Sequence, residues 1–99
     1  MPNYNEKILN RLTKEMGLSE AQAKELLKDI LVLNGNLKAI FDKWLEDPRC
    51  VEDYESHGFS IKGMMERYKL TFVAAVLTMD WIDKEPEVAV KAIKSRFRV

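Results

Sequence analysis

Apolar residues are more concentrated in one stretch of the chain, residues 70–82, than anywhere else. After its second position only Thr78 and Asp80 are polar, so no polar stripe recurs there at helical spacing. A helix that is apolar on every side is usually surrounded by other helices, and this stretch is too short to cross a bilayer, which needs about 20 residues. The pattern therefore predicts a central core helix hidden from water on all sides, with Phe72 and Trp81 inside.

Apolar residues also recur at helical spacing before and after this core stretch. The predicted helices lie at about residues 4–16, 20–33, 37–46, 60–68, 71–83 and 86–97. No alternation of apolar and polar residues with the period of a strand continues for more than a few positions. The sequence predicts an all-α fold, a compact bundle of about five helices that forms a single domain over residues 1–99.

Polar residues at the predicted helix starts support these boundaries. The candidate N-caps are Asn3, Ser19, Asn36, Ser60 and Thr71, and Ser19 with Gln22 has the spacing of a capping box. Gly17 suits the left-handed conformation that ends a helix. Asp47-Pro48 ends the third helix, because a residue before proline is pushed out of the α region. Residues 47–59 follow as a polar, acidic loop with room for one short helical turn at Val51 and Tyr54.

The two halves of the sequence partly superimpose when the chain is shifted by 52 residues. The matched pairs are Leu9 with Ile61, Leu12 with Met64, Met16 with Tyr68, Leu18 with Leu70, Ser19 with Thr71, Ala23 with Ala75, Leu27 with Met79, and Ile30 with Ile82. Two interpretations stay open. In the first, the halves 4–46 and 60–97, joined by the acidic loop 47–59, arose by duplication. In the second, two capped helix pairs share the pattern for packing reasons alone.

Residues 12–26, with Gly17, Leu18 and Ser19 in the turn, resemble the DNA-binding helix-turn-helix motif. The resemblance implies that the helix at 20–33 would be the DNA recognition helix. Its outer face carries Glu20, Gln22, Lys24, Glu25, Lys28 and Asp29. Contacts to phosphate demand a positive face, and three acids against two lysines do not supply one. Two packed helices with a capped turn are the structural alternative.

The same region is similar to a ubiquitin-associated domain over about 40 of the 99 residues. The matching residues are Met16-Gly17-Leu18, Ala23, Leu26-Leu27, Asn36, Ile40-Phe41 and Trp44-Leu45. The resemblance implies an apolar binding patch made of Met16, Gly17, Leu18 and the Trp44-Leu45 end of the third helix. The chain departs from that family in a second helix some three residues longer and in Ile40, which replaces a small alanine.

Charge is balanced overall but uneven along the chain. The chain contains sixteen basic and sixteen acidic residues. Residues 36–58 carry three basic and six acidic side chains, a net charge of −3, whereas residues 84–99 carry five basic and two acidic ones, a net of +3. Two interpretations stay open: the two segments attract each other within one chain or between two chains, or each segment is an ordinary solvated face.

Candidate catalytic and metal-binding residues are few. The single histidine, His57, follows Cys50, Asp53 and Glu55 in the acidic loop, but this spacing matches no structural zinc site. A Cys50–His57 nucleophile pair has no orienting acid or oxyanion hole that the sequence identifies. We therefore expect no catalytic activity, no metal and no cofactor.

The best interpretation is a protein–protein interaction module that binds a protein partner or a second copy of itself. Aromatic residues and methionine are enriched at interfaces, and the candidate interface residues are Trp44, Phe41, Phe97, Met16 and Leu18. The alternative is a nucleic-acid-binding protein that uses residues 12–33 or the basic residues Lys91, Lys94, Arg96 and Arg98. A single cysteine and an N-terminus without an apolar run predict a cytoplasmic protein that binds no membrane.

Overall fold

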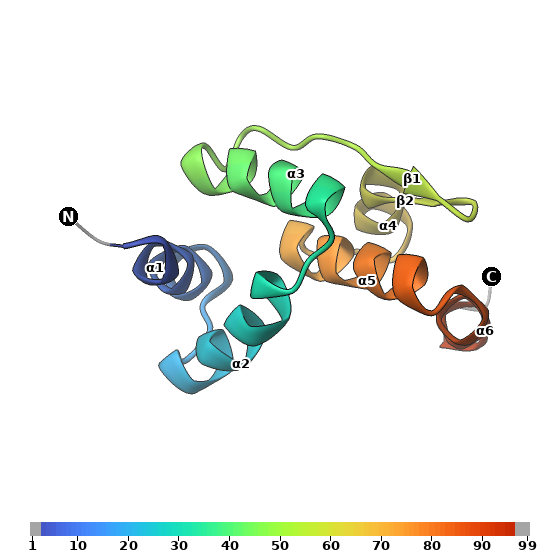
Figure 1. Ribbon diagram of the computed structural model, residues 1–99, viewed down its shortest axis with the longest axis horizontal. Coiled ribbons are helices and arrows are strands. Elements are labelled where there is room, and N and C mark those ends of the chain that lie inside the picture. Colours follow the sequence, from blue (N-terminus) through green and yellow to red (C-terminus); the bar gives the residue numbers. More distant parts are fainter. Residues whose placement is uncertain (1–2, 97–99) are drawn as a thin grey trace.

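Six helices and one short hairpin make up residues 3–96, the part of the chain that the computed structural model describes (Figure 1). The elements are α1 (Tyr4–Met16), α2 (Glu20–Leu31), α3 (Gly35–Glu46), β1 (Glu55–Ser56), β2 (Phe59–Ser60), α4 (Ile61–Arg67), α5 (Phe72–Lys84) and α6 (Pro86–Arg96). The prediction of an all-α fold is confirmed. Position 97, the predicted end of the last helix, lies outside the described residues.

Helix α5 is central, as its apolar sequence predicts. It contacts α3, α4, α6 and β1, while α1 contacts α2 and α3. The described chain is elongated, with extents of 43 × 24 × 22 Å. The pair α1 and α2 lies at one end of the long axis and α6 lies at the other (Figure 1). The two ends are therefore joined through α3 and α5.

Large apolar side chains from five helices fill one continuous core. Its fully buried large members are Ile8, Leu12, Ile30, Leu37, Phe41, Ile61, Met64, Val73, Val76, Met79 and Ile82. Trp44 joins α3 to α5, because its ring centroid lies 5.6 Å from that of Phe41 and 5.2 Å from that of Phe72. Such tilted pairs add about 0.5–1.5 kcal/mol beyond the burial of their area.

The prediction that the core helix is hidden on every side is wrong. Trp81 is 37% exposed, and Ala74, Leu77 and Thr78 are only partly buried. These four residues follow the spacing i, i+3, i+4 and i+7, so they form one stripe along α5. The neighbouring helices cover the other sides of α5 and leave this stripe partly open.

Side-chain caps fix the helix starts, with one change from the prediction. Asn3, Ser19, Ser60 and Thr71 each accept a hydrogen bond from the backbone N–H three residues later. The predicted cap Asn36 is wrong: α3 begins at Gly35, and the cap is Asn34, whose Oδ1 accepts from the Leu37 N–H at 3.0 Å. Helix α2 ends at Leu31 rather than at position 33, which leaves Asn34 free to take the capping position.

The acidic loop contains a hairpin that the sequence pattern does not predict. Residues Glu55 and Ser56 pair with Ser60 and Phe59 in antiparallel register. His57 and Gly58, with φ angles of 51° and 82°, form the two-residue turn, since a type I′ turn needs positive φ at both central positions. The expected helical turn at Val51 and Tyr54 is absent, because residues 51–54 form no regular secondary structure.

The turns between α1 and α2 and between α4 and α5 share their backbone geometry. Gly17 and Lys69, which are 52 positions apart, both have left-handed φ angles, 64° and 58°. The caps that follow, Ser19 and Thr71, both have φ −69° and ψ 162°. Helices α1 and α4 differ in length, 13 against 7 residues. The local geometry repeats, and duplication of the halves stays a hypothesis.

The two tryptophans allow a direct test of which sides of α5 are covered. Trp44→Ala is expected to lower the free energy of unfolding by about 3–5 kcal/mol, because it removes a buried ring between Phe41 and Phe72. Trp81→Ala is expected to cost about 1 kcal/mol, because Trp81 is already 37% exposed in the folded chain. Urea unfolding of both variants measures the difference. Equal losses would contradict the open side of α5.

Candidate functional site

The predicted interface residues divide into core and surface positions. Phe41 is fully buried and Trp44 is 6% exposed, so neither offers a side chain to a partner. Met16 and Leu18 flank the turn between α1 and α2 and are partly buried. Phe97 lies outside the described residues. The structure therefore brings Phe41 and Trp44 together in the core and leaves Met16 and Leu18 at the edge of the first helix pair.

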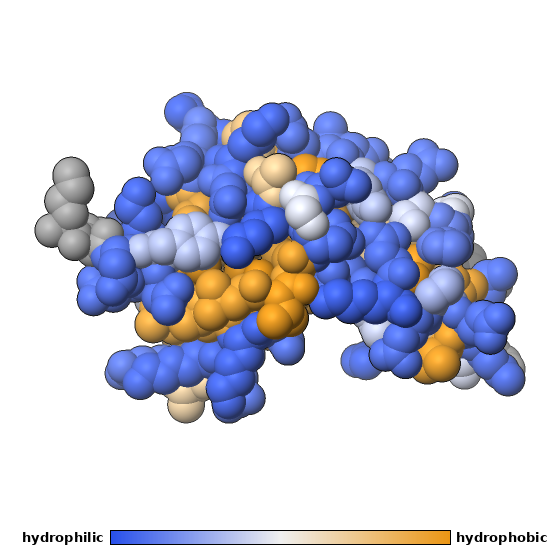
Figure 2. Space-filling model, in the orientation of Figure 1, coloured by the Kyte–Doolittle hydropathy of each residue, from blue (hydrophilic) through white to orange (hydrophobic). Residues whose placement is uncertain are grey.

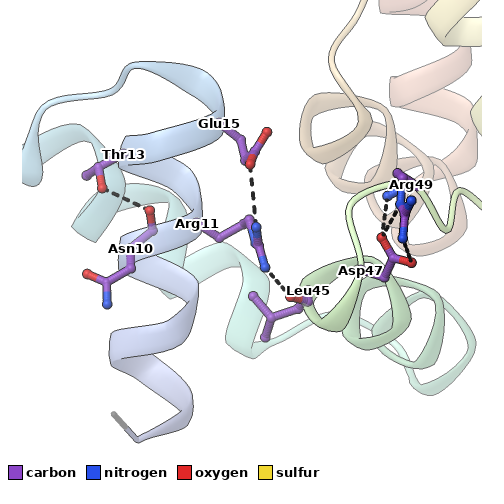
Figure 3. Close-up of polar contacts among 7 residues, drawn as sticks. All are labelled: Asn10, Arg11, Thr13, Glu15, Leu45, Asp47 and Arg49. Atoms are coloured by element: carbon purple, nitrogen blue, oxygen red, sulfur yellow. Dashed lines mark hydrogen bonds and ion pairs between the residues drawn. The ribbon is translucent and has the colours of Figure 1, made fainter. Parts of the chain in front are cut away.

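Helix α1 covers the end of α3 that the ubiquitin-associated resemblance assigns to binding. The guanidinium of Arg11 donates from Nη2 to the Leu45 carbonyl at 3.0 Å and pairs with Glu15 at 3.4 Å (Figure 3). A cation at the last carbonyls of a helix is favourable. Leu45 itself is buried, so this end of α3 is a packing region in which Leu45 contacts α1 and Trp44 contacts α5.

A second contact joins the first residue of α1 to α3, about one turn before Leu45. The Tyr4 hydroxyl donates to Oδ1 of Asp42 at 2.5 Å. Burial first, and then the hydrogen bond and charge of Asp42, raise the pKa of the Tyr4 hydroxyl well above its ordinary range. The ammonium of Lys38 lies 5.6 Å from the centroid of the Tyr4 ring, within the range of a cation–π contact. Two polar contacts, from Tyr4 and from Arg11, thus join α1 to the C-terminal half of α3.

The outer face of α2 carries the residues that the helix-turn-helix resemblance assigns to DNA. All of them are exposed. Lys24 pairs with Glu20 at 3.3 Å, and Lys28 pairs with Glu25 at 3.4 Å. Both lysines therefore have an acidic neighbour on the same helix, which weakens the attraction of this face for phosphate.

An apolar area lies at the C-terminal end of α2. Leu31 is 39% exposed and Val32 is 61% exposed, and Leu27, one turn before Leu31, is partly buried. Figure 2 shows a continuous hydrophobic area over the part of the molecule where α2 lies in Figure 1, with polar side chains at its border. We call Leu27, Leu31 and Val32 the α2 surface.

One signal in the sequence could have identified the α2 surface. The apolar positions of the second helix are Ala21, Ala23, Leu26, Leu27, Ile30, Leu31 and Leu33. These positions cover a wider arc than one buried face of a short helix. Part of the arc had to remain at the surface.

A groove between α5 and α6 forms the second apolar site. It has a volume of about 250 Å³ and is lined by Leu70, Thr78, Trp81, Ala92, Ile93 and Arg96. Trp81 comes from the open stripe of α5. Val88, which is 57% exposed, lies one helical turn before Ala92 on the same face of α6. We call this site the α5–α6 groove.

The predicted basic residues lie on α6. Lys91, Lys94 and Arg96 are exposed, and Arg98 lies outside the described residues. Lys91 and Lys94 line an open groove of about 680 Å³ together with His57 at the tip of the hairpin. Arg96 lines the α5–α6 groove on the other flank of the helix. The described basic residues therefore divide between two sides of α6.

A buried carboxylate at the centre of the molecule holds the α2–α3 turn against α5. Asp80 is buried, and its Oδ1 accepts from the Asn34 backbone N–H at 3.1 Å. Its Oδ2 pairs with the Lys84 ammonium at 2.7 Å, and Lys84 also donates to the Val32 carbonyl at 2.8 Å. Because these partners satisfy both carboxylate oxygens, Asp80 is a structural group of the junction rather than a free acid.

A second carboxylate holds the hairpin against α5. Asp83 accepts from the Tyr54 hydroxyl at 2.7 Å, from Ser56 Oγ at 2.6 Å and from Asn34 Nδ2 at 3.0 Å. Burial works to raise the pKa of the Asp83 carboxyl, but the hydrogen bonds from Ser56, Tyr54 and Asn34 outweigh it and hold that pKa below its ordinary value. The bond to Asp83, and then burial, raise the pKa of the Tyr54 hydroxyl. Asp83 therefore joins the hairpin, α3 and α5.

Cys50 and His57 lie at separate places on the same connection. Cys50 donates its backbone N–H to the Asp47 carbonyl just after α3, and His57 lies in the hairpin turn. The connection runs extended along α3 between these points (Figure 1). Within residues 3–96 no three acidic, histidine or cysteine side chains gather as a metal site. In the same residues every helix is too short or too polar to cross a membrane.

The hydrogen bonds to Asp83 make stability depend on pH. Because the folded-state pKa of Asp83 is depressed, the contribution of Asp83 to the free energy of unfolding is fully present above the unfolded pKa of about 3.9. This contribution is lost as pH falls through the lower folded-state pKa.

Asp83→Asn is expected to lower stability at neutral pH and to flatten the curve of unfolding free energy against pH below about 4. Urea unfolding across pH 2–7 checks this (roughly the range over which carboxylates titrate). Asp29→Asn, on the exposed face of α2, is the matched control. If the unfolding free energy of Asp83→Asn fell with pH below about 4 as steeply as that of the wild type, the depressed pKa of Asp83 would be contradicted.

Comparison of the chain with protein-family models, with curated proteins and with solved structures gave no match. The local resemblances to the helix-turn-helix motif and to the ubiquitin-associated domain therefore gain no support from these comparisons.

Proposed function

We propose that this protein is a non-catalytic protein–protein interaction module that pairs with a second copy of itself through the α2 surface. The observation that carries the proposal is the exposure of Leu31 and Val32, at 39% and 61%, beside Leu27 on one flank of a helix end. Apolar side chains that gather at the surface, bordered by polar residues, are typical of interaction sites.

Charge at the border of the α2 surface favours a second copy as the partner. The exposed residues Lys24, Glu25, Lys28 and Asp29 alternate in sign along α2. In a two-fold symmetric dimer the same patch meets itself, so an interface must be complementary to its own charges. A border of both signs meets this requirement, whereas a border of one sign would repel its copy.

The size of the α2 surface limits the strength of such a dimer. A stable interface buries about 1,200–2,000 Å², which three side chains do not supply by themselves. The charged face of α2 must therefore contribute the rim, where ion pairs add little. These magnitudes predict a dimer with a Kd in the micromolar range (about −8 kcal/mol).

Sedimentation equilibrium over a range of concentrations tests the proposal. The wild-type chain is expected to pass from monomer to dimer, and Leu31→Lys is expected to weaken dimerisation at least tenfold, or about 1.4 kcal/mol, because it places a charge in the apolar centre. Val88→Lys changes a more exposed apolar residue on α6 and is expected to dimerise like the wild type.

Two results would refute self-association through the α2 surface. The first is a wild-type chain that remains a monomer at every concentration. The second is a dimer that Leu31→Lys leaves intact, because such a dimer forms through another face.

Nucleic-acid binding is the second candidate function, and one observation favours it. Lys91 and Lys94 meet His57, from a distant part of the sequence, along one open groove. This groove also contains one acidic residue, Glu87. On the outer face of α2, by contrast, both lysines pair with acidic neighbours and add little net positive charge. Helix α6 is therefore the better of the two predicted nucleic-acid surfaces.

A gel-shift titration at low salt separates the two functions. If nucleic acid binds through α6, Lys91→Glu with Lys94→Glu is expected to abolish the shift of a DNA duplex or a single strand. The matched pair Lys24→Glu with Lys28→Glu is expected to leave the shift intact. Binding should weaken steeply with added salt, since released counterions drive it. No shift at low salt would remove this candidate.

A further inference from the structure

The α5–α6 groove is a second apolar site whose function is independent of self-association. It lies beside the one stripe of α5 that its neighbouring helices leave partly open, and Trp81 forms part of its wall. The α2 surface belongs to a different helix and a different half of the chain. The two sites can therefore be altered separately.

The dimensions of the α5–α6 groove restrict what it holds. Its volume of about 250 Å³ is below the 300–1,000 Å³ of typical small-molecule sites (an approximate range). The apolar lining of Leu70, Trp81, Ala92 and Ile93 suits one or two large apolar side chains. A protein segment that inserts an anchor residue and lies across the two helices matches this shape better than a free ligand does.

Charges around the groove select the partner further. Arg96 lines it, and the exposed residue Lys69 directly precedes the lining residue Leu70. Asp80, beside Trp81 in sequence, is buried and paired with Lys84. Glu85, one turn after Trp81, is exposed. The basic residues outnumber this acid near the groove, so they attract a segment with negative charge around its apolar anchor.

We propose that the α5–α6 groove binds an acidic amphipathic helix of another protein, with a large apolar side chain of that helix seated between Trp81 and Ala92. The binding mode is that of a helix in a groove, in which apolar residues at helical spacing supply affinity. The basic residues at the rim supply the preference for acidic partners and raise the rate of encounter.

Fluorescence anisotropy with two synthetic peptides tests this proposal. The first probe is a fluorescein-labelled helical peptide of about four turns with leucine at i, i+3, i+4 and i+7 and glutamate on its other faces. The second probe replaces every glutamate with lysine. The acidic peptide is expected to bind at least about tenfold more tightly, and its binding should weaken as salt is added.

Variants of the full-length chain locate the binding. Ala92→Glu fills the groove and introduces a negative charge at an exposed position, and Trp81→Ala removes part of the groove wall. Each is expected to weaken binding of the acidic peptide at least about fivefold (roughly 1 kcal/mol). Leu31→Lys is the matched control and should bind the peptide like the wild type, whatever the oligomeric state. Circular dichroism confirms that each variant retains its helices.

Three outcomes would overturn the proposal. They are equal binding of the acidic and basic peptides, binding that survives Ala92→Glu, and tighter binding of a fluorescein-labelled oligothymidylate, which would make Trp81 a stacking platform for single strands. A wild-type monomer in sedimentation refutes the α2 dimer without affecting this result. The two proposals therefore fail independently.

Discussion

The burial of α5 is the constraint on which the rest of the structure depends. Phe72, Val73, Val76 and Met79 leave water when α3 and α4 pack against this helix, and each large side chain contributes roughly 1.5–3 kcal/mol on full burial. Trp44 extends the same packing to α3 through its contact with Phe72. The remaining helices join the structure through these two: α6 contacts α5, while α1 contacts α3 and supports α2.

Polar groups fix the angle at which these helices meet. Apolar packing alone is not directional, whereas Asp80 and Asp83 bind specific atoms of the α2–α3 turn and the hairpin. Asn34 contributes to both, because it caps α3 with its oxygen and donates to Asp80 and Asp83 with its amide nitrogen. This junction adjoins the α2 surface, since Lys84 of α5 donates to the Val32 carbonyl. It is a structural element of the fold.

Both candidate sites are parts of apolar faces that the fold does not cover. A helix with apolar residues around more than half of its circumference needs neighbours on several sides. Helix α1 and the core cover only part of the apolar surface of α2. In the same way, α3, α4 and α6 cover only part of the apolar surface of α5. Leu31, Val32 and Trp81 are therefore apolar residues that these helices leave exposed. Their chemistry suits partner proteins, because aromatic and aliphatic side chains bordered by charge provide affinity and selectivity together.

The sequence by itself determined the helices, because their signals are local. Capping residues such as Ser19 and Thr71 and the period of apolar residues involve neighbours within about one turn. It also determined that α5 is central, since no other segment is so apolar. Only the tertiary structure decided that Trp44 is buried while Trp81 is exposed, that Asn34 rather than Asn36 caps α3, and that His57 meets α6. Each of these depends on which distant segment packs against the residue, and that information lies in contacts between residues far apart in the chain.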